Sequence, residues 1–383
     1  MFILEKPYVS ELLIDTIVQN DWPVLKNQTI LDSDIEEGAF DIIPSDIAKN
    51  YYIAQEFPLI YSNSELAHNW VLENLPDSNL SKYIKLFKNK IEFRDFLKEM
   101  FPDFYYKGAT LEEIKNIKPE ELKYPIVIKP SMGIDNIGVH CINEAKELAD
   151  TISKLEKEMQ HATKMYPKQT ISTTQVIIEE LIKGEEYSID AYFDRDGEPV
   201  ILNIFQHPAC NCFKANNRIY LTSTGIMIKY LAKFGLLLRD IGLLKDIRNL
   251  PIHMEVKVTD DGNIIPIEIN PMRFSTWCAA DIAKYAWGIN VYEYFFEQDA
   301  PDWNEIFSNA SSDVFYYSIA DVPSVGNING FQYEKYLSNF SNVLEVRRID
   351  YSSNPIFALV FGSTRSKDEI VDILSLDIKD YIL

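Results

Sequence analysis

Two glutamates, Glu255 and Glu268, lie in short apolar segments on either side of the Asp-Gly pair at 261–262. Asp-Gly is a favoured two-residue turn of a β-hairpin because both positions tolerate positive φ. A turn at this pair would place Glu255 opposite Glu268, and His253 opposite Asn270, on one face of the hairpin. Opposed Cβ atoms lie about 4.5 to 5.5 Å apart, and like charges there destabilise a sheet. The sequence therefore predicts two facing carboxylates that need a compensating positive charge.

A divalent cation would supply that charge. Mg²⁺ is bound through one or two carboxylates and completes its coordination with nucleotide phosphates and water. We therefore interpret Glu255 and Glu268 as a metal site. The alternative is a solvated hairpin face on which Lys257 and water screen the two acids. A register slip of one residue would also move the two glutamates to opposite faces.

A lysine and two glycines follow an apolar run further back in the chain. Lys129 ends the segment Ile-Val-Ile-Lys-Pro at 126–130, and Gly133 and Gly138 lie just beyond it. An ammonium beside a glycine-bearing turn can act as a point charge on a phosphate. The segment 131–138 matches neither the Walker A motif nor the dinucleotide fingerprint. A lysine at a solvent-facing strand end is the alternative interpretation.

The acidic segment 179–186, Glu-Glu-Leu-Ile-Lys-Gly-Glu-Glu, runs from the end of an expected strand through a glycine into an expected hairpin. This order is typical of a hinge between two lobes. Exposed hinge backbone can bind the edge of an adenine, and a carboxylate shortly after it can accept hydrogen bonds from ribose hydroxyls. Viewed in isolation, a plain acidic turn explains the segment equally simply.

The elements that would position these residues can be read from apolar periodicity. Alternating short apolar runs and helical patterns over 1–85 predict a small open α/β domain. A helical pattern at 86–100 precedes an α+β unit that comprises strands at 125–129, 139–142 and 175–181 and a helix at 144–161. Two hairpins follow, the first with its turn at Asp196 and Gly197 and the second with its turn at 261–262. Strand and helix patterns beyond residue 302 predict a small α+β domain.

The composition excludes several classes of protein. The chain has 383 residues, 46% hydrophobic and 13% aromatic, which is enough for cores in two or three packed domains. A formal net charge of −21 would repel a phosphate backbone, so we expect no nucleic-acid partner. No apolar stretch approaches the ~20 residues that span a bilayer, so we expect no membrane partner and a cytoplasmic protein. Four scattered cysteines do not indicate a disulfide framework.

Taken in order, five motifs resemble those of the ATP-grasp superfamily, and within it the carboxylate-amine ligases that include L-amino acid ligases and biotin carboxylase. The motifs are Asn-Lys at 89–90, Ile-Lys-Pro-Ser at 128–131, the acidic segment 179–186, His-Met-Glu at 253–255 and Glu-Ile-Asn-Pro at 268–271. The resemblance implies the ATP-grasp fold, with an N-terminal α/β domain at 1–85, an ATP-grasp domain at 86–300 and a C-terminal α+β domain at 301–383. Within the middle domain, 124–183 would be the smaller, nucleotide-clamping lobe.

The same resemblance implies roles for single residues. Those expected to bind ATP are Lys90, Lys129, Ser131, Gly133, Glu179, Glu180, Leu181, Ile182 and Glu186. Glu255, Glu268 and Asn270 would bind Mg²⁺, and Arg273, with Lys129, would stabilise the transferred phosphoryl group. Many relatives carry an arginine directly after Asn-Pro, whereas Met272 intervenes before Arg273 here.

The implied reaction is the ATP-dependent activation of a small-molecule carboxylate as an acyl phosphate, followed by attack of an amine and release of ADP and phosphate. Phosphoryl transfer of this kind depends on positioning and charge neutralisation, so a nucleophilic side chain is not needed. Two alternatives stay open: an ATP-grasp enzyme with an acceptor other than an amine, and a regulatory nucleotide-binding protein without turnover. A homodimer is a further expectation from the resemblance.

Overall fold

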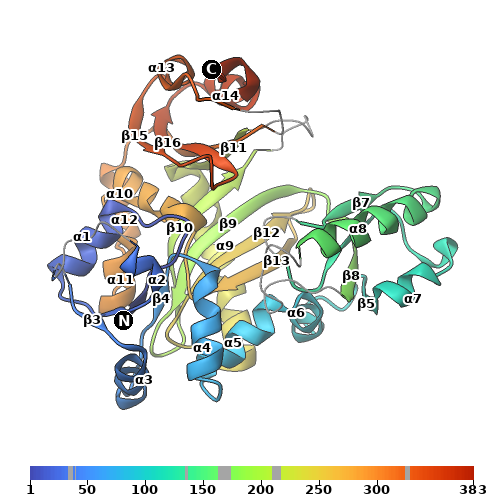
Figure 1. The fold of residues 1–383 in the computed structure, drawn as a ribbon, viewed down its shortest axis with the longest axis horizontal. Coiled ribbons are helices and arrows are strands. Elements are labelled where there is room, and N and C mark those ends of the chain that lie inside the picture. The colour runs from blue at the N-terminus through green and yellow to red at the C-terminus, as the bar shows by residue number, and fades with distance from the viewer. Residues whose placement is uncertain (33–37, 39, 134–136, 163–173, 209–216, 324–327) are drawn as a thin grey trace. The chain divides into compact units, whose positions relative to one another are not determined.

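The computed structural model describes residues 1–383 except 33–37, 39, 134–136, 163–173, 209–216 and 324–327. The described chain divides into two compact units (Figure 1). The first unit comprises Met1–Ala67, Glu185–Glu255 and Met272–Leu383, and the second comprises His68–Gly184 and Val256–Pro271. The predicted domain boundaries near 85 and 300 stay a prediction.

The first unit begins with a parallel four-stranded sheet in the order β3-β2-β1-β4. Its strands are β1 (Phe2–Ile3), β2 (Val24–Leu25), β3 (Ile42–Ile43) and β4 (Tyr61–Ser62), joined by helices α1 (Glu11–Gln19), α2 (Gln28–Leu31) and α3 (Ser45–Ala54). Strands alternating with helices produce a parallel sheet because each crossover returns the chain to the same edge. The predicted N-terminal α/β arrangement is confirmed.

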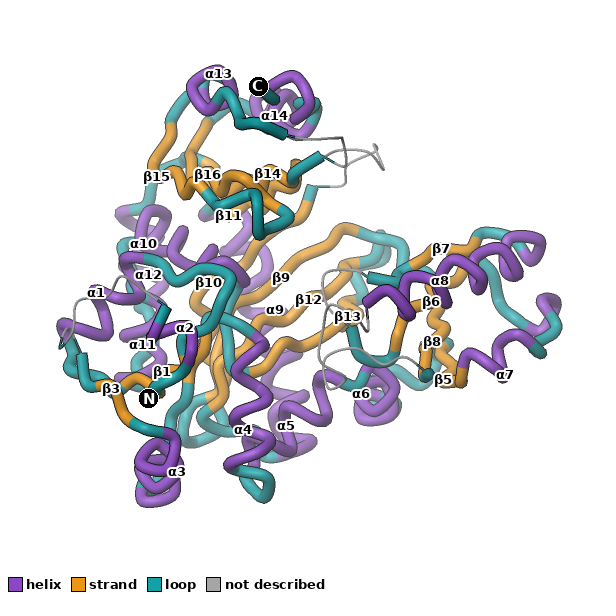
Figure 2. The backbone as a smooth tube through the Cα atoms, viewed as in Figure 1, coloured by secondary structure: helices purple, strands orange, loops and turns teal. Residues whose placement is uncertain are grey.

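The first unit also contains most of a large sheet, whose strands from β12 onward follow the order β12-β9-β10-β11-β14-β16-β15 (Figure 2). The strands are β9 (Glu185–Phe193), β10 (Pro199–His207), β11 (Asn217–Thr222), β12 (Leu250–Val258), β14 (Val314–Asp321), β15 (Val343–Arg348) and β16 (Ile356–Thr364). Antiparallel pairing between β11 and β14 makes the C-terminal strands a continuation of this sheet. The long helix α9 (Thr224–Lys245) packs against β10.

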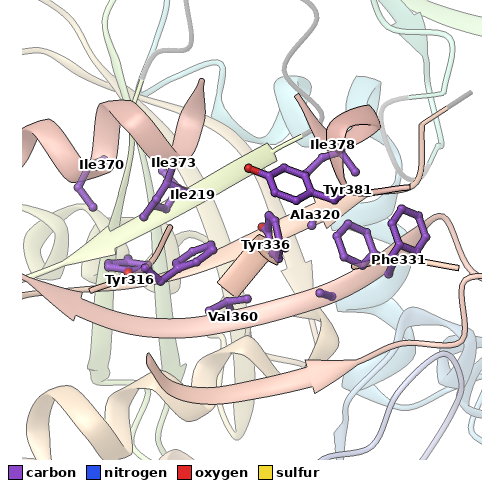
Figure 3. Packing of buried hydrophobic residues seen from close by; sticks show 13 residues of the cluster. Ile219, Tyr316, Ala320, Phe331, Tyr336, Val360, Ile370, Ile373, Ile378 and Tyr381 are labelled. Carbon is purple, nitrogen blue, oxygen red and sulfur yellow. The ribbon is translucent and has the colours of Figure 1, made fainter. Parts of the chain in front are cut away.

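Aromatic and aliphatic side chains form the core at the C-terminal end of this sheet (Figure 3). They come from β11, β14 and β16 and from the helices α13 (Tyr333–Leu337) and α14 (Lys367–Leu374). The rings of Phe331 and Phe357 stack with centroids 4.0 Å apart, and Tyr336 is fully buried beside them. Further helices of the unit are α10 (Ile282–Trp287), α11 (Val291–Glu297) and α12 (Trp303–Asn309).

The second unit is built around an antiparallel four-stranded sheet in the order β5-β8-β6-β7. The strands are β5 (Tyr106–Thr110), β6 (Ile126–Pro130), β7 (His140–Ile142) and β8 (Gln175–Glu180). Helix α8 (Leu148–Ala162) packs on the sheet because apolar side chains at 148, 152, 155 and 159 recur at helical spacing along one side. The short helix α7 (Leu111–Lys115) joins the same core.

The predicted single helix at 86–100 is wrong in one respect, because the chain forms two helices here. Helix α5 (Asn79–Lys88) ends at Asn89, and α6 (Lys90–Leu97) begins directly after it. Asn89 has extended backbone, and its side-chain oxygen accepts hydrogen bonds from the N–H groups of Ile91 and Glu92. An asparagine in this conformation caps a new helix rather than continuing an old one. Before α5, α4 (His68–Asn74) opens the unit.

Both predicted two-residue hairpin turns are also wrong, and for the same reason. Between β12 and β13 (Ile264–Pro271), Gly262 N–H donates to the Thr259 carbonyl at 2.8 Å, and Thr259 N–H donates to the Asn263 carbonyl at 2.9 Å. The turn therefore has three residues and ends at a glycine with φ of 86°. It sets Thr259 opposite Asn263, so beside the turn the pairing is one residue away from the predicted register. The placement of Glu255 opposite Glu268 no longer follows from the turn and stays a prediction. The loop between β9 and β10 repeats this pattern, with Gly197 at φ of 86°. An Asp-Gly pair is suited both to a two-residue turn and to a three-residue turn in which a type I turn is followed by a left-handed glycine. The residue types therefore did not distinguish the two kinds of turn.

Candidate functional site

Lys90 and Glu268 lie side by side in the second unit. Lys90 is the first residue of α6, and Glu268 belongs to β13. Lys90 Nζ lies 3.1 Å from Glu268 Oε2, and the Asn270 amide donates to Glu268 Oε1 at 3.1 Å. The side chains of Lys90 and Glu268 are 13% and 25% exposed, so the pair is accessible yet mostly shielded from solvent. Three residues predicted from two separate motifs therefore form one contact group.

The electrostatics keep Glu268 ionised. Burial by itself would raise the pKa of this carboxyl, but the positive charges of Lys90, Lys88 and Lys129 and the bond from Asn270 lower it to about 2. At neutral pH the group therefore presents a carboxylate and a carboxamide beside a cluster of ammonium groups. Such oxygens are the ligands that a hard divalent cation prefers.

Lys129 and Glu179 form a second ion pair in the same unit. Val127 on β6 pairs with Glu179 on β8, so Lys129, two residues further along β6, lies on the same face of the sheet as Glu179. Lys129 Nζ lies 2.6 Å from Glu179 Oε2, and both side chains are buried. Burial lowers the pKa of Lys129, and the Glu179 carboxylate opposes that shift.

Arg94 binds the other oxygen of Glu179, and it was missed at the sequence level. Its Nε donates to Glu179 Oε1 at 2.5 Å. Burial would raise the pKa of Glu179, but the charges of Lys129 and Arg94 and their hydrogen bonds lower it to about 2. Arg94 lies four residues after Lys90, on the same face of α6. That spacing was the only available signal, because nothing in the sequence links α6 to β8.

The remaining residues predicted in this unit lie around the ends of β6 and β8. Ser131 is buried, its carbonyl accepts from Lys90 N–H at 2.7 Å, and its Oγ has no hydrogen-bond partner among the described residues. The Glu180 carboxylate accepts from Tyr105 N–H at 3.0 Å. Leu181 N–H donates to the Pro125 carbonyl at 3.1 Å, and Ile182 is partly exposed beside it.

The glycines of the site differ in how strictly they are required. A Cβ added to Gly133 would meet only ordinary van der Waals contacts, the nearest at 3.8 Å from Pro130. A Cβ on Gly184, where φ is 144°, would lie 2.3 Å from the Val258 carbonyl oxygen. The acidic segment therefore contains a position that only glycine can occupy, because the backbone there passes very close to the hairpin backbone at Val258.

Three predicted residues lie in the first unit: Glu186, Glu255 and Arg273. Glu186 Oε1 is 3.1 Å from His207 Nδ1, and Glu255 Oε1 is 3.8 Å from His253 Nε2. Arg273 is buried and pairs with Glu65 at 2.9 Å. Because these residues and the contact group around Glu268 belong to different units, the meeting of Glu255 or Arg273 with Glu268 stays a prediction.

The inserted Met272 has a structural explanation. It is fully buried and adopts φ of 71°, its N–H donates to the Pro251 carbonyl, and its carbonyl accepts from Ser62 N–H. A left-handed methionine is strained, and the two backbone bonds hold it in place. The insertion is therefore a fixed bend of the chain immediately before Arg273.

A buried polar network in the first unit was not predicted. Asp190 is fully buried, its Oδ1 lies 2.7 Å from His253 Nδ1, and its Oδ2 accepts from Ser275 Oγ at 2.8 Å. One carboxylate thus links β9, β12 and the segment that carries Arg273. An Asp flanked by Ile189 and Ala191 in a strand that ends Ala-Tyr-Phe was the available sequence signal.

Among the described residues, no three or more histidine, cysteine, aspartate and glutamate side chains are gathered so as to hold a metal by themselves. Glu268 and the Asn270 amide oxygen fit a site of another kind, in which the protein supplies few ligands and bound phosphates supply the others. No helix in the described part of the chain is long and apolar enough to cross a membrane.

Part of the chain is similar to a known family of domains. Residues 122–281 match the family described as the ATP-grasp domain. No curated protein matches the sequence significantly.

Solved structures resemble the whole chain. An L-amino acid ligase from Bacillus licheniformis has a TM-score of 0.70 at 16% identity, over 100% of this chain and 97% of that one. The biotin carboxylase domain of the Hydrogenobacter thermophilus 2-oxoglutarate carboxylase, solved with MgADP and bicarbonate, has a TM-score of 0.63 at 12% identity, over 100% and 90%. A phosphoribosylglycinamide synthetase from Anaerococcus prevotii has a TM-score of 0.57 at 13% identity, over 100% and 98%. The chain therefore has the ATP-grasp fold, and residues 122–281 resemble an ATP-grasp domain.

Proposed function

We propose that this chain is an ATP- and Mg²⁺-dependent carboxylate-amine ligase that forms an acyl phosphate and releases ADP and phosphate. The observation that carries the proposal is the contact group in the second unit, in which Lys90 pairs with Glu268, Asn270 binds the same carboxylate, and Lys129 lies near enough to lower its pKa. Cations for phosphates and oxygen ligands for a metal are the two requirements of phosphoryl transfer from ATP.

In this proposal the residues divide by task. Lys90 and Lys129 bind phosphates, Ser131 and Gly133 lie along the same segment, and Glu179, Glu180, Leu181, Ile182 and Glu186 form the nucleoside pocket. Glu255, Glu268 and Asn270 hold Mg²⁺, which would neutralise charge on the transferred phosphoryl group. Ser131 Oγ, which is buried and has no hydrogen-bond partner in the part of the chain that the structure describes, supports a polar ligand at this place. Arg273, whose Nε lacks a partner among the described residues, would stabilise the same charge.

The ligase reaction is favoured over other ATP-grasp chemistry by the L-amino acid ligase, which is similar over nearly its full length. The substrates in the proposal are a small carboxylate, such as an amino acid, and an amine. The proposed domains are 1–85, 86–300 and 301–383, with 124–183 as the nucleotide-clamping lobe, and a homodimer is proposed as the assembly.

The test is ADP and phosphate release from the purified protein with Mg²⁺-ATP, with pools of amino acids and small carboxylates and mass detection of products. We expect release that depends on the pool, accompanies a condensed product, and disappears in Glu268→Ala. Nucleotide binding without turnover in every pool would instead support a regulatory protein. Substrate-dependent release with a product that contains no new amide would support another acceptor.

A further inference from the structure

Arg94 joins three elements that carry the proposed nucleotide and metal residues, although its own side chain is only 3% exposed. Its Nε binds Glu179, which in turn binds Lys129. One of its terminal nitrogens, Nη1, donates to the Pro266 carbonyl at 2.6 Å, two residues before Glu268. The guanidinium therefore connects α6, β8 with β6, and β13.

The environment of Arg94 shows that its geometry matters as well as its charge. The guanidinium carbon lies 4.3 Å from the centre of the Phe104 ring, which fixes the plane of the group. The other terminal nitrogen, Nη2, is buried and has no partner among the described residues. An unsatisfied buried donor lowers the stability of the fold. Arg94 thus makes directed hydrogen bonds to Glu179 and to the Pro266 carbonyl, although Nη2 has no partner among the described residues.

A lysine could not replace this arrangement. A planar guanidinium makes bonds in two fixed directions, whereas an ammonium is a point charge at the end of a flexible chain. A lysine at position 94 would keep a charge for Glu179 but would lose the directed hydrogen bond to the Pro266 carbonyl.

We propose that Arg94 is a positioning residue with two separable tasks: through Glu179 it sets the place of the phosphate-binding Lys129, and through the Pro266 carbonyl it sets the place of the metal-binding end of β13. This inference rests on the proposed function. The part of the proposed adenine-binding backbone that follows Glu179 has supports other than Arg94, because the Glu180 and Leu181 N–H groups donate to the carbonyls of Tyr105 and Pro125.

The test compares binding of adenosine, ADP and Mg²⁺-ADP to the full-length wild type, Arg94→Met and Arg94→Lys by calorimetry. Arg94→Met should weaken ADP binding about tenfold or more while adenosine binding changes less than about twofold. Arg94→Lys, which retains a charge for Glu179, should bind metal-free ADP within about threefold of the wild type, yet lose most of the gain in affinity that Mg²⁺ provides.

Lys115→Met is the matched control, because it removes a cation from an ion pair of the same unit. The Lys115 and Glu156 side chains lie 2.9 Å apart, and both are partly exposed. It should leave all three affinities unchanged. Should Arg94→Met fail to fold, Arg94→Lys carries the test alone through its ratio of affinities with and without Mg²⁺.

Equal loss of adenosine, ADP and Mg²⁺-ADP binding in the Arg94 variants would overturn the inference and indicate a merely structural role. Unchanged Mg²⁺-ADP binding in Arg94→Lys would overturn it as well, with the proposed function intact. A wild type that binds no nucleotide would overturn both.

Discussion

Lys90 Nζ lies 3.1 Å from Glu268 Oε2, so a residue expected to bind phosphate is paired with a residue expected to bind metal. The two charges neutralise each other. A metal ion on Glu268 would compete with Lys90, and a phosphate on Lys90 would compete with Glu268. A metal ion on Glu268 would release Lys90 to bind phosphate, and a phosphate on Lys90 would release Glu268 to bind metal. The binding of metal and the binding of nucleotide should therefore strengthen each other.

The Lys90→Met variant tests this exchange of partners. Without the ammonium, Glu268 has lost its competitor, so Mn²⁺ used as a probe should bind the nucleotide-free protein several-fold more tightly, whereas ATP should bind about tenfold more weakly. Electron paramagnetic resonance of free Mn²⁺ and calorimetry with ATP measure the two affinities. Shifts of both affinities in the same direction would contradict the exchange.

Glu179 predicts a dependence of stability on pH. Its pKa is lowered from 4.5 to about 2, so the folded state binds fewer protons than the unfolded state between these values. The contribution of Glu179 is present in full above pH 4.5 and is lost as the pH falls toward 2. The urea midpoint of the wild type should fall through this acid window.

In Glu179→Gln this part of the pH dependence should disappear. The variant should also be less stable at pH 7 by about 3 to 5 kcal/mol, because Arg94 and Lys129 are left buried without their carboxylate. Urea unfolding at pH 7 and at several values below 4.5 measures both effects. A variant with the same acid dependence as the wild type would show that other carboxyls dominate.

Gly184→Ala should destabilise the protein by about 3 kcal/mol or more, since the new Cβ would lie 2.3 Å from a carbonyl oxygen and φ is 144°. Gly133→Ala is the matched control, because its new Cβ would make only ordinary contacts, and its unfolding should change by less than about 0.5 kcal/mol. Thermal unfolding of the two variants gives the comparison. Equal midpoints would contradict the close backbone approach at Gly184.

Asp190→Ala should lower kcat about tenfold or more and leave ADP binding close to that of the wild type. The reason is that Asp190 holds Ser275, two residues after Arg273, as well as His253, whereas Lys90 and Lys129, which are proposed to bind the phosphates, belong to the second unit. Steady-state kinetics and calorimetry separate the two quantities. Asp190→Asn, which retains most hydrogen-bonding capacity, should recover part of the rate.

Much of the architecture could be predicted because apolar periodicity reports local structure. The strand at 125–129 and the helix at 144–161 differ from β6 and α8 mainly at their ends. The break at Asn89 and the three-residue turns were predicted wrongly because the same residues can adopt more than one backbone conformation. The sequence pattern alone does not say which conformation they adopt. Asn89 was read as a helical residue, although it is equally a helix cap.

The candidate site could be predicted only where motifs name the residues. The pairing of Lys90 with Glu268 joins positions 178 apart, which no local pattern encodes. Arg94 and Asp190 were missed because they act through other side chains, and their importance appears only once Glu179, Pro266, His253 and Ser275 have been placed around them.

The most direct test of the ligase proposal follows the oxygen atoms of the substrate. A carboxylate substrate identified in the pooled assay is labelled with ¹⁸O in both carboxyl oxygens and incubated with Mg²⁺-ATP and its amine. Activation as an acyl phosphate transfers one carboxyl oxygen to the phosphate, so we expect released phosphate with one ¹⁸O atom, together with ADP and an amide that retains the other. Unlabelled phosphate, or release of AMP and pyrophosphate, would contradict the account.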